Sequence, residues 1–283
     1  MAALQGIKQR IRSVTNTKQI TKAMQLVAAS KLRRAQESAI GPQAYTEAAK
    51  TILLQLSGGV EVGRNALFQV RKVENALTII VGGDRGMAGA YNSNITKAFS
   101  KHVLATPASH QVIAIGRRAA SYGAHIADIT ELAAYEMDAN EADIGLAKPI
   151  LDEVLELFRS SQVDAVHIIY THFVTTIKQE TMVDQLLPIV APPKSKPTVG
   201  ELEPEPEILL DFVVMKVLEA QILQAILESR ASEQAARMVA MLNATDNATE
   251  IIGDLTLEFN NARQAAITQE LAEISGGTEA INA

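Results

Sequence analysis

The sequence predicts a protein of mixed α+β and α/β class, in which a long antiparallel coiled coil of the N- and C-terminal helices carries an inserted α/β domain. Two observations predict this fold. Apolar residues recur at coiled-coil spacing near both ends of the chain, and strand-like runs alternate with helical stretches between them. We expect four segments: an N-terminal helix at 1–57, an α/β domain at 75–190, a Pro-rich connector at 191–207 and a C-terminal helix at 208–283.

The N-terminal segment predicts one long helix over residues 2–57. Its first apolar residues step by 3, 4 and 3, as in a coiled coil: Leu4, Ile7, Ile11 and Val14. This stripe then loosens through Ile20, Met24 and Val27. We expect a bend at Pro42, because proline removes a hydrogen bond to the preceding turn.

The middle of the chain has the texture of an α/β domain. Strand-like runs occupy 76–81, 111–116 and 165–177, and helical stretches occupy about 87–104 and 142–160. Such alternation predicts a largely parallel sheet of the Rossmann-like kind. The connector that follows is rich in Pro and charged residues, which is typical of an extended segment.

The C-terminal segment predicts a helix that no compact globule of this size could contain. Residues 208–275 lack Pro, and an apolar seam steps by 4, 3, 4, 3 and 4: Ala248, Ile252, Leu255, Phe259, Ala262 and Ala266. At 1.5 Å per residue the helix would be on the order of 100 Å long, roughly twice the diameter of a compact chain of this length. Its seam needs a partner, and the N-terminal helix is the other long one. We therefore expect an antiparallel rod with a globular domain.

Charge is distributed unevenly between the two ends. Residues 1–36 contain no acidic side chain but eight basic ones: Lys8, Arg10, Arg12, Lys18, Lys22, Lys31, Arg33 and Arg34. All but Arg10 and Lys31 fall within about 160° of the helix circumference. A solvated face is the ordinary interpretation of such a run, and the twelve acidic and four basic residues of 207–283 compensate part of it. An external acidic partner remains open, because helices usually mix charges to gain i,i+4 pairs.

Several classes of function are disfavoured. Nucleic acid is not expected as a partner, because no aromatic residue precedes Tyr45 and the net charge is −6. Membrane insertion is not expected either, since the most apolar stretch, 208–227, contains Asp211, Lys216 and Glu219. The chain has no Cys, and its five His show no metal-ligand spacing, so we expect no metal site.

The glycine loop of residues 82–89 offers two interpretations. Asp84 stands where a dinucleotide fingerprint needs its second glycine, although the later Arg117 and Arg118 could accommodate a 2′-phosphate. An NADP-dependent oxidoreductase therefore remains the alternative function. We favour a structural strand-to-helix turn in which Asp84 pairs or caps locally. We find no P-loop and no convincing catalytic constellation, and we expect neither catalytic residues nor a cofactor.

Both ends of the chain resemble a known family. The stretch "IKQRIRSVTNTKQITKAMQLVAASKLRRAQ" (7–36) resembles the opening of the gamma subunit of F-type ATP synthases, and "ASEQAARMVAMLNATDNATEIIGDLTLEFNNARQAAITQELAEISGG" (231–277) resembles its end. The loop "DRGMAGAYN" (84–92) and "EPEPE" (203–207) are similar to family segments as well. The resemblance covers essentially the whole chain and favours a bacterial source.

The resemblance implies a non-catalytic rotor shaft in a proton- or sodium-driven enzyme, peripheral at the cytoplasmic face of the bacterial plasma membrane. Its implied partners are the alpha and beta subunits of the hexameric head, the epsilon subunit and the ring of c subunits. The residues that it implies for the head are Arg263, Gln264, Thr268, Met24 and Lys22, with Lys8, Arg12, Lys18, Arg33 and Arg34 on the basic face. Those that it implies for the c-ring and epsilon are Leu202, Glu203 and Glu205.

Overall fold

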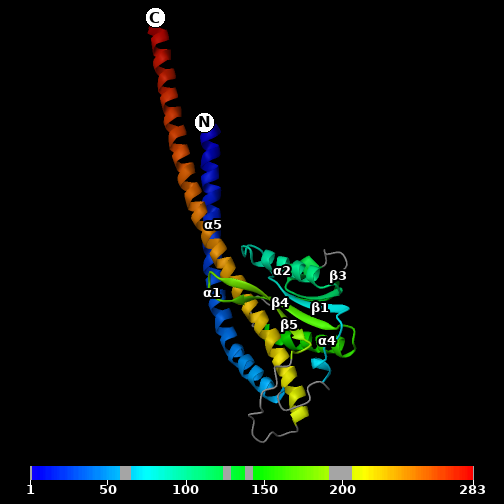
Figure 1. The fold of residues 1–283 in the computed structure, drawn as a ribbon. Helices are drawn as coiled ribbons and strands as arrows, with labels where there is room; N and C mark the ends of the chain where they lie inside the picture. Colours follow the sequence, from blue (N-terminus) through cyan, green and yellow to red (C-terminus); the bar gives the residue numbers. More distant parts are fainter. Residues whose placement is uncertain (1, 58–64, 124–128, 138–142, 191–205, 283) are drawn as a thin grey trace. The chain divides into compact units, whose positions relative to one another are not determined.

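The computed structural model describes residues 2–57, 65–123, 129–137, 143–190 and 206–282. Two very long helices begin and end the chain: α1 (Ala2–Ser57) and α5 (Pro206–Asn282), the latter of 77 residues. Contacts divide the chain into two units, which we call the coiled-coil unit (residues 1–27 and 238–283) and the α/β unit (residues 28–237). Both helices run through both units (Figure 1).

The α/β unit contains a five-stranded sheet in the order β3-β2-β1-β4-β5. Its strands are β1 (Asn75–Val81), β2 (Ser109–Ile115), β3 (Ile129–Tyr135), β4 (Ala165–Phe173) and β5 (Gln179–Leu187). The first four pair in parallel, and β5 joins β4 in an antiparallel hairpin. The predicted mixed fold of terminal long helices and an inserted, largely parallel sheet is therefore confirmed.

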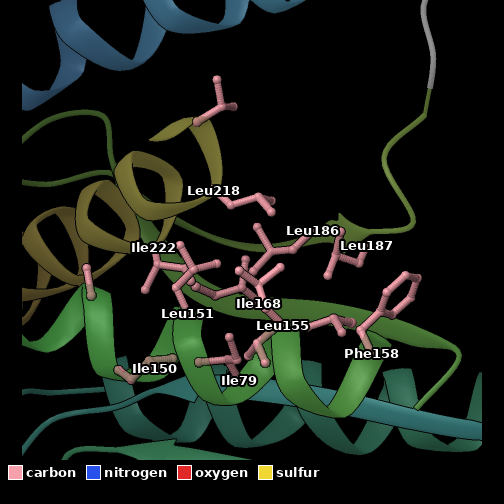
Figure 2. Close-up of a cluster of buried hydrophobic side chains, with 14 of the residues drawn as sticks. Ile79, Ile150, Leu151, Leu155, Phe158, Ile168, Leu186, Leu187, Leu218 and Ile222 are labelled. Carbon is pink, nitrogen blue, oxygen red and sulfur yellow. The ribbon is translucent and has the colours of Figure 1, made fainter. Parts of the chain in front are cut away.

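Helices cover both faces of the sheet. The shorter ones are α2 (Tyr91–Ala105), α3 (Arg117–Gly123) and α4 (Ala147–Arg159), with 3₁₀ turns η2 (Ala66–Phe68) and η3 (Asp143–Leu146). Alternate residues of β1 separate the two layers: Ile79 packs with α4 and the first half of α5, whereas Ile80 packs with α2 and α3. Figure 2 shows the first of these clusters, with Leu218 and Ile222 of α5 near Ile168 of β4, and with Phe158 of α4 below Leu187.

Three features of the α/β unit differ from the sequence-based expectation. The run 165–177 contains the whole of β4 and most of a turn, after which β5 returns beside β4. The edge strand β3 and the seven-residue helix α3 were not expected. The helix expected at 87–104 begins at Tyr91, because the glycine loop continues to Ala90. As predicted, α1 is one helix that runs through Pro42, and the Thr46 hydroxyl donates to the Pro42 carbonyl at 2.8 Å.

Candidate functional site

In the coiled-coil unit, α1 and α5 meet along one seam. All six seam residues predicted on α5, from Ala248 to Ala266, are buried or half-buried, while most of their neighbours are exposed. On α1 the half-buried and buried positions continue at heptad spacing: Leu4, Ile7, Ile11, Val14, Lys18, Thr21 and Gln25. We predicted that the apolar stripe of α1 continues, more loosely, through Ile20 and Val27. This prediction is wrong for both residues, because their side chains are 60% and 57% exposed. The prediction followed apolar residue type, whereas the helix period keeps the polar Lys18 and Thr21 on the seam.

A hydrogen bond explains how a polar residue is accommodated there. The hydroxyls of Thr21 and Thr245 lie 2.8 Å apart across the seam, and both side chains are buried. The Thr245 hydroxyl also donates to the Met241 carbonyl at 2.8 Å. Burying a hydroxyl is tolerated when it has a partner, so this pair fits an otherwise apolar seam and also specifies its register.

The basic face predicted on α1 is exposed over most of its length. Lys8, Arg12 and Lys22 are exposed in the coiled-coil unit, and the Lys22 ammonium donates to the Gln25 amide oxygen at 3.1 Å. Lys18 differs, because its position on the seam leaves it half-buried. The stretch of α1 in the coiled-coil unit thus presents cationic groups to solvent, with no acidic residue of its own.

The α/β unit holds the other two arginines of the predicted face. Arg33 pairs with Glu37 at 3.0 Å on the helix surface, where the two side chains are 82% and 62% exposed. Arg34 is also exposed. An exposed i,i+4 pair contributes at most a few tenths of a kcal/mol, so Arg33 can exchange Glu37 for another carboxylate at little cost.

The three polar residues predicted near the end of α5 lie on two successive turns of the helix. Arg263, Gln264 and Thr268 are all exposed, and the Thr268 hydroxyl donates to the Gln264 carbonyl at 2.9 Å. Met24 of α1 is half-buried. Leu202, Glu203 and Glu205, predicted to face the c-ring and epsilon, lie outside the described residues.

Beyond the seam, α5 presents an apolar stripe that was not predicted. Ile267, Leu271 and Ile274 lie at i, i+4 and i+7, on one face of the helix, and are 48%, 62% and 67% exposed. Within the coiled-coil unit, α5 extends past the start of α1 here (Figure 1). The spacing could have revealed this stripe, because it is the ordinary signal for an apolar helix face.

The glycine loop forms a tight turn between β1 and α2. Asp84 was expected to pair or cap locally, but its partner lies 33 residues away: its carboxylate accepts from the backbone N–H of Arg117 at 3.1 Å, at the start of α3. The Asn92 side chain accepts from the Gly83 N–H at 3.1 Å. Gly116 has a φ of +92°, and a Cβ there would lie 2.5 Å from the Gly82 carbonyl oxygen. Glycine is therefore required where the two strand ends approach each other.

A carboxylate of α5 occupies the space beside this loop. A Cβ at Gly83 would lie 2.7 Å from the Glu233 carboxylate oxygen. Glu233 is 5% exposed and forms an ion pair with Arg237, which also donates to the Arg85 and Gly86 carbonyls at 3.3 Å each. Burial raises the pKa of Glu233, and Arg237 opposes that rise. In dinucleotide-binding loops the second glycine lets the backbone approach the pyrophosphate. Here Asp84 stands in place of that glycine, and the Glu233 carboxylate lies against the adjacent Gly83, so two acidic side chains disfavour the oxidoreductase alternative.

Further polar contacts join α5 to the end of β4. The Thr171 N–H donates to the Ser229 hydroxyl at 2.9 Å, and the Ser232 hydroxyl donates to the Thr171 carbonyl at 3.0 Å. The adjacent His172 pairs with Glu228. These residues were not among the predicted site residues. Their only signal is a set of polar residues spaced by three and four in an otherwise Ala-rich helix.

Three histidines, one each from α2, β2 and β4, lie close together where α2 packs on the sheet. His102 and His167 have ring centroids 4.5 Å apart, and His110 adds positive potential to both. Each has a buried ring nitrogen without a hydrogen-bond partner in the structure. Burial, followed by the other two histidines, lowers the pKa of His167 to about 4. Among the described residues, no group of three or more His, Cys, Asp or Glu is arranged to hold a metal ion.

No helix in the described parts of the chain is long and apolar enough to cross a membrane.

The family described as ATP synthase matches residues 3–281. The ATP synthase gamma chain of Heliobacterium modesticaldum is 38% identical over 291 residues, covering 99% of this chain and 100% of the relative. That of Chlorobium chlorochromatii is 39% identical over 293 residues, covering 100% of both.

Solved structures agree on the fold. The chain resembles one from the Euglena gracilis mitochondrial ATP synthase (OSCP/F1/c-ring, rotational state 3) with a TM-score of 0.71 at 18% identity, covering 99% of this chain and 95% of that one. It also resembles one from the central stalk and c-ring of the Tetrahymena thermophila mitochondrial enzyme, with a TM-score of 0.64 at 23% identity, covering 80% and 99%. A family match over nearly the whole length, with relatives of this identity, leads to one conclusion: the chain belongs to the ATP synthase gamma-chain family, the non-catalytic central shafts of these rotary enzymes.

Proposed function

We propose that this chain is the rotating shaft that couples a proton- or sodium-driven c-ring to conformational change in the catalytic beta subunits of an F-type ATP synthase. The observation that carries the proposal is the paired-helix seam of α1 and α5, continued by an α5 end with an exposed apolar stripe. A partner with an apolar lining would cover Ile267, Leu271 and Ile274, as a sleeve formed by the alpha and beta subunits would do.

The exposed cations of α1 fit contacts with acidic loops of the head. Lys8, Arg12 and Lys22 are accessible, and Arg33 is held only by a surface pair. Contacts of this kind contribute about 0–1 kcal/mol each at a hydrated interface. Weak contacts suit a shaft that must exchange partners every third of a turn. They drive the head only if they differ among its states, because differential interaction alone shifts a conformational equilibrium.

Two parts of the proposal rest on the resemblance alone. We assign Leu202, Glu203 and Glu205 to contacts with the c-ring and epsilon, and we place the assembled chain at the cytoplasmic face of a bacterial plasma membrane. We assign Arg263, Gln264 and Thr268 to contacts with the head, and their exposure on α5 supports this assignment. Met24 contributes through its accessible side, and Lys18 and Arg34 extend the basic face.

The decisive experiment uses the complete ATP synthase reconstituted in vesicles with the variant Arg263→Glu, Gln264→Ala. Ion-driven ATP synthesis should fall at least several-fold while the complex stays assembled, because the reversed charge meets the head at each step. Lys97→Glu, a charge reversal at an exposed position of α2, serves as the control and should leave synthesis unchanged. Unaltered synthesis in the Arg263→Glu, Gln264→Ala complex would refute the assignment of these contacts.

Two measurements separate the shaft from its alternatives. Affinity purification of the complex should recover one copy of this chain per three catalytic subunits, whereas a free-standing coiled-coil scaffold would not assemble with them. Isothermal titration of the isolated chain with NADP should detect no micromolar binding, because the Glu233 carboxylate fills the space beside the glycine loop. Micromolar binding would instead favour the oxidoreductase.

A further inference from the structure

Five polar residues of α5 lie on one side of the helix and are buried against the sheet. They step by one, three, one and four along the helix and are at most 9% exposed: Glu228, Ser229, Ser232, Glu233 and Arg237. We call them the α5 polar face. Burying so many polar groups on one helix is unfavourable unless each has a partner, so their hydrogen bonds matter for how α5 packs on the sheet.

The first anchor of the α5 polar face is the end of β4. Pairing between β1 and β4 ends at Ile80 and Ile169, so β4 continues past its neighbour. Ser229 accepts from the Thr171 N–H, and Ser232 donates to the Thr171 carbonyl, at 2.9 and 3.0 Å. The two serines thus bind both backbone groups of one strand residue, as a neighbouring strand would.

The second anchor is the glycine loop, at the end of the adjacent strand β1. Arg237 donates to two successive carbonyls, those of Arg85 and Gly86, while pairing with Glu233. Gly83 leaves room for the Glu233 carboxylate, because a Cβ there would lie 2.7 Å from its oxygen and the carboxylate would have to shift. Two strand ends of the sheet are therefore bound to neighbouring turns of the same helix.

These anchors differ in kind from the apolar docking of α5 against the sheet. Leu218 and Ile222 are buried among side chains of α4 and the sheet. Apolar burial is non-directional, so a small rotation of the helix about its axis changes it little. Hydrogen bonds weaken steeply as their angle departs from linearity, so the same rotation would strain all the polar contacts at once.

We propose that the α5 polar face is a torsional lock, which fixes the rotational position of α5 against the sheet and lets the α/β unit turn the helix without slip. The proposal rests on the shaft function proposed above. Its residues are positioning residues: they act through the backbone of Thr171 and of the glycine loop, and through the rigidity of α5.

The test is the ratio of ATP-driven ion pumping to ATP hydrolysis in the reconstituted complete enzyme. One variant is Glu233→Gln, Arg237→Met, which removes the ion pair without leaving a buried charge unpaired. The other is Ser229→Ala, Ser232→Ala. The control is Ile222→Val, a slight loss of apolar packing on the same helix. Each polar variant should lower the ratio at least threefold against an opposing ion gradient, while the control keeps the wild-type ratio.

Conservative substitution separates torsional locking from a general loss of stability. Arg237→Lys keeps the cation and a donor, so it should retain at least half of the wild-type ratio even if its thermal stability falls as far as that of the Glu233→Gln, Arg237→Met variant. An unchanged ratio in both polar variants, or an equal loss in Ile222→Val, would overturn the lock. Failure of the wild-type chain to assemble with alpha and beta subunits would instead overturn the shaft function.

Discussion

The coiled-coil unit and the α/β unit of this chain are stabilised in different ways. In the α/β unit the central strand has side chains such as Ile79 and Ile80 at 0% and 1% exposed, and Phe158 on α4 is fully buried. In the coiled-coil unit, only Thr21, Met241, Thr245 and Ala248 fall to 9% exposure or below among the described side chains. The rest of its seam is half-buried, because two helices can shield only one side of each other.

This difference indicates which unit can fold by itself. Apolar burial contributes about 25 cal/mol per Å², so a sheet with helices packed on both faces gains far more from its own residues than a helix pair does. The coiled-coil unit leaves large apolar residues such as Leu26, Leu257 and Leu271 61–65% exposed. It therefore depends on covering partners for part of its stability, whereas the α/β unit supplies its own core.

The strongest test of this contrast is Phe158→Ala. The ring is fully buried, and Arg71 lies over it with its guanidinium carbon 5.0 Å from the ring centroid. We expect the free energy of unfolding of the isolated chain to fall by about 3–5 kcal/mol, through lost burial and the cavity left behind. Urea denaturation measures this. Leu271→Ala, at an exposed site of the coiled-coil unit, should change it by less than about 0.5 kcal/mol. Equal losses would erase the distinction.

A smaller effect is expected from acid, confined to the α/β unit. The pKa of His167 is lowered to about 4 by burial and by its two histidine neighbours, so the fold favours its neutral form. The stabilisation is complete above the ordinary pKa of about 6.5 and is lost as pH falls toward 4. After allowance for solvent screening, we expect a loss of about 1 kcal/mol between pH 7 and pH 5.

Urea midpoints at the two pH values measure this loss, with His167→Gln as the matched variant. Glutamine cannot take up a proton, so the variant should be less sensitive to pH over this range. A wild-type chain and a variant with the same pH dependence would show that the histidine cluster is not the group that titrates.

The smallest expected effect lies in the coiled-coil unit. Thr21→Val removes one hydroxyl of the seam pair, and we expect a loss of about 0.5 kcal/mol in the free energy of unfolding. Thr21→Val with Thr245→Val should cost less than the sum of the single changes, because the hydroxyls interact only with each other across the seam. Thermal melting of the four proteins gives the coupling. Strict additivity would mean that the Thr21 and Thr245 hydroxyls do not interact across the seam and do not specify its register.

The sequence predicts the long-range features of this fold better than its local ones. The seam from Ala248 to Ala266 was found because a heptad pattern repeated over several turns is hard to produce by chance. Strand β3, with sequence "ITELAAY", was missed because Ala and Glu are poor strand formers and an edge strand is only half-buried. The hairpin of β4 and β5 was missed because no Gly or Asn marks its turn.

The residues of the candidate site also fall into two groups, those that the sequence can predict and those that it cannot. Exposure of Arg263, Gln264 and Thr268 could be anticipated, because polar residues outside a heptad seam face solvent. The α5 polar face could not, since the partners of Ser229 and Arg237 lie 58 and 151 residues away in the chain. Hydrogen bonds of that span depend on the tertiary fold, and no local pattern reports them.

Glu233 at the glycine loop has a further consequence for a protein that belongs to an ATP-handling complex. A nucleoside triphosphate that approached this loop would meet a buried carboxylate of like charge, already held by Arg237. The domain thus carries its own internal anion where a related fold would take one from solution. We therefore expect no nucleotide to bind at this loop, and we expect the stiffness of the domain not to depend on the cell's ATP and ADP concentrations. A transmission part that turns among nucleotide-binding neighbours gains from such indifference, because its mechanics stay constant as the energy charge of the cell varies.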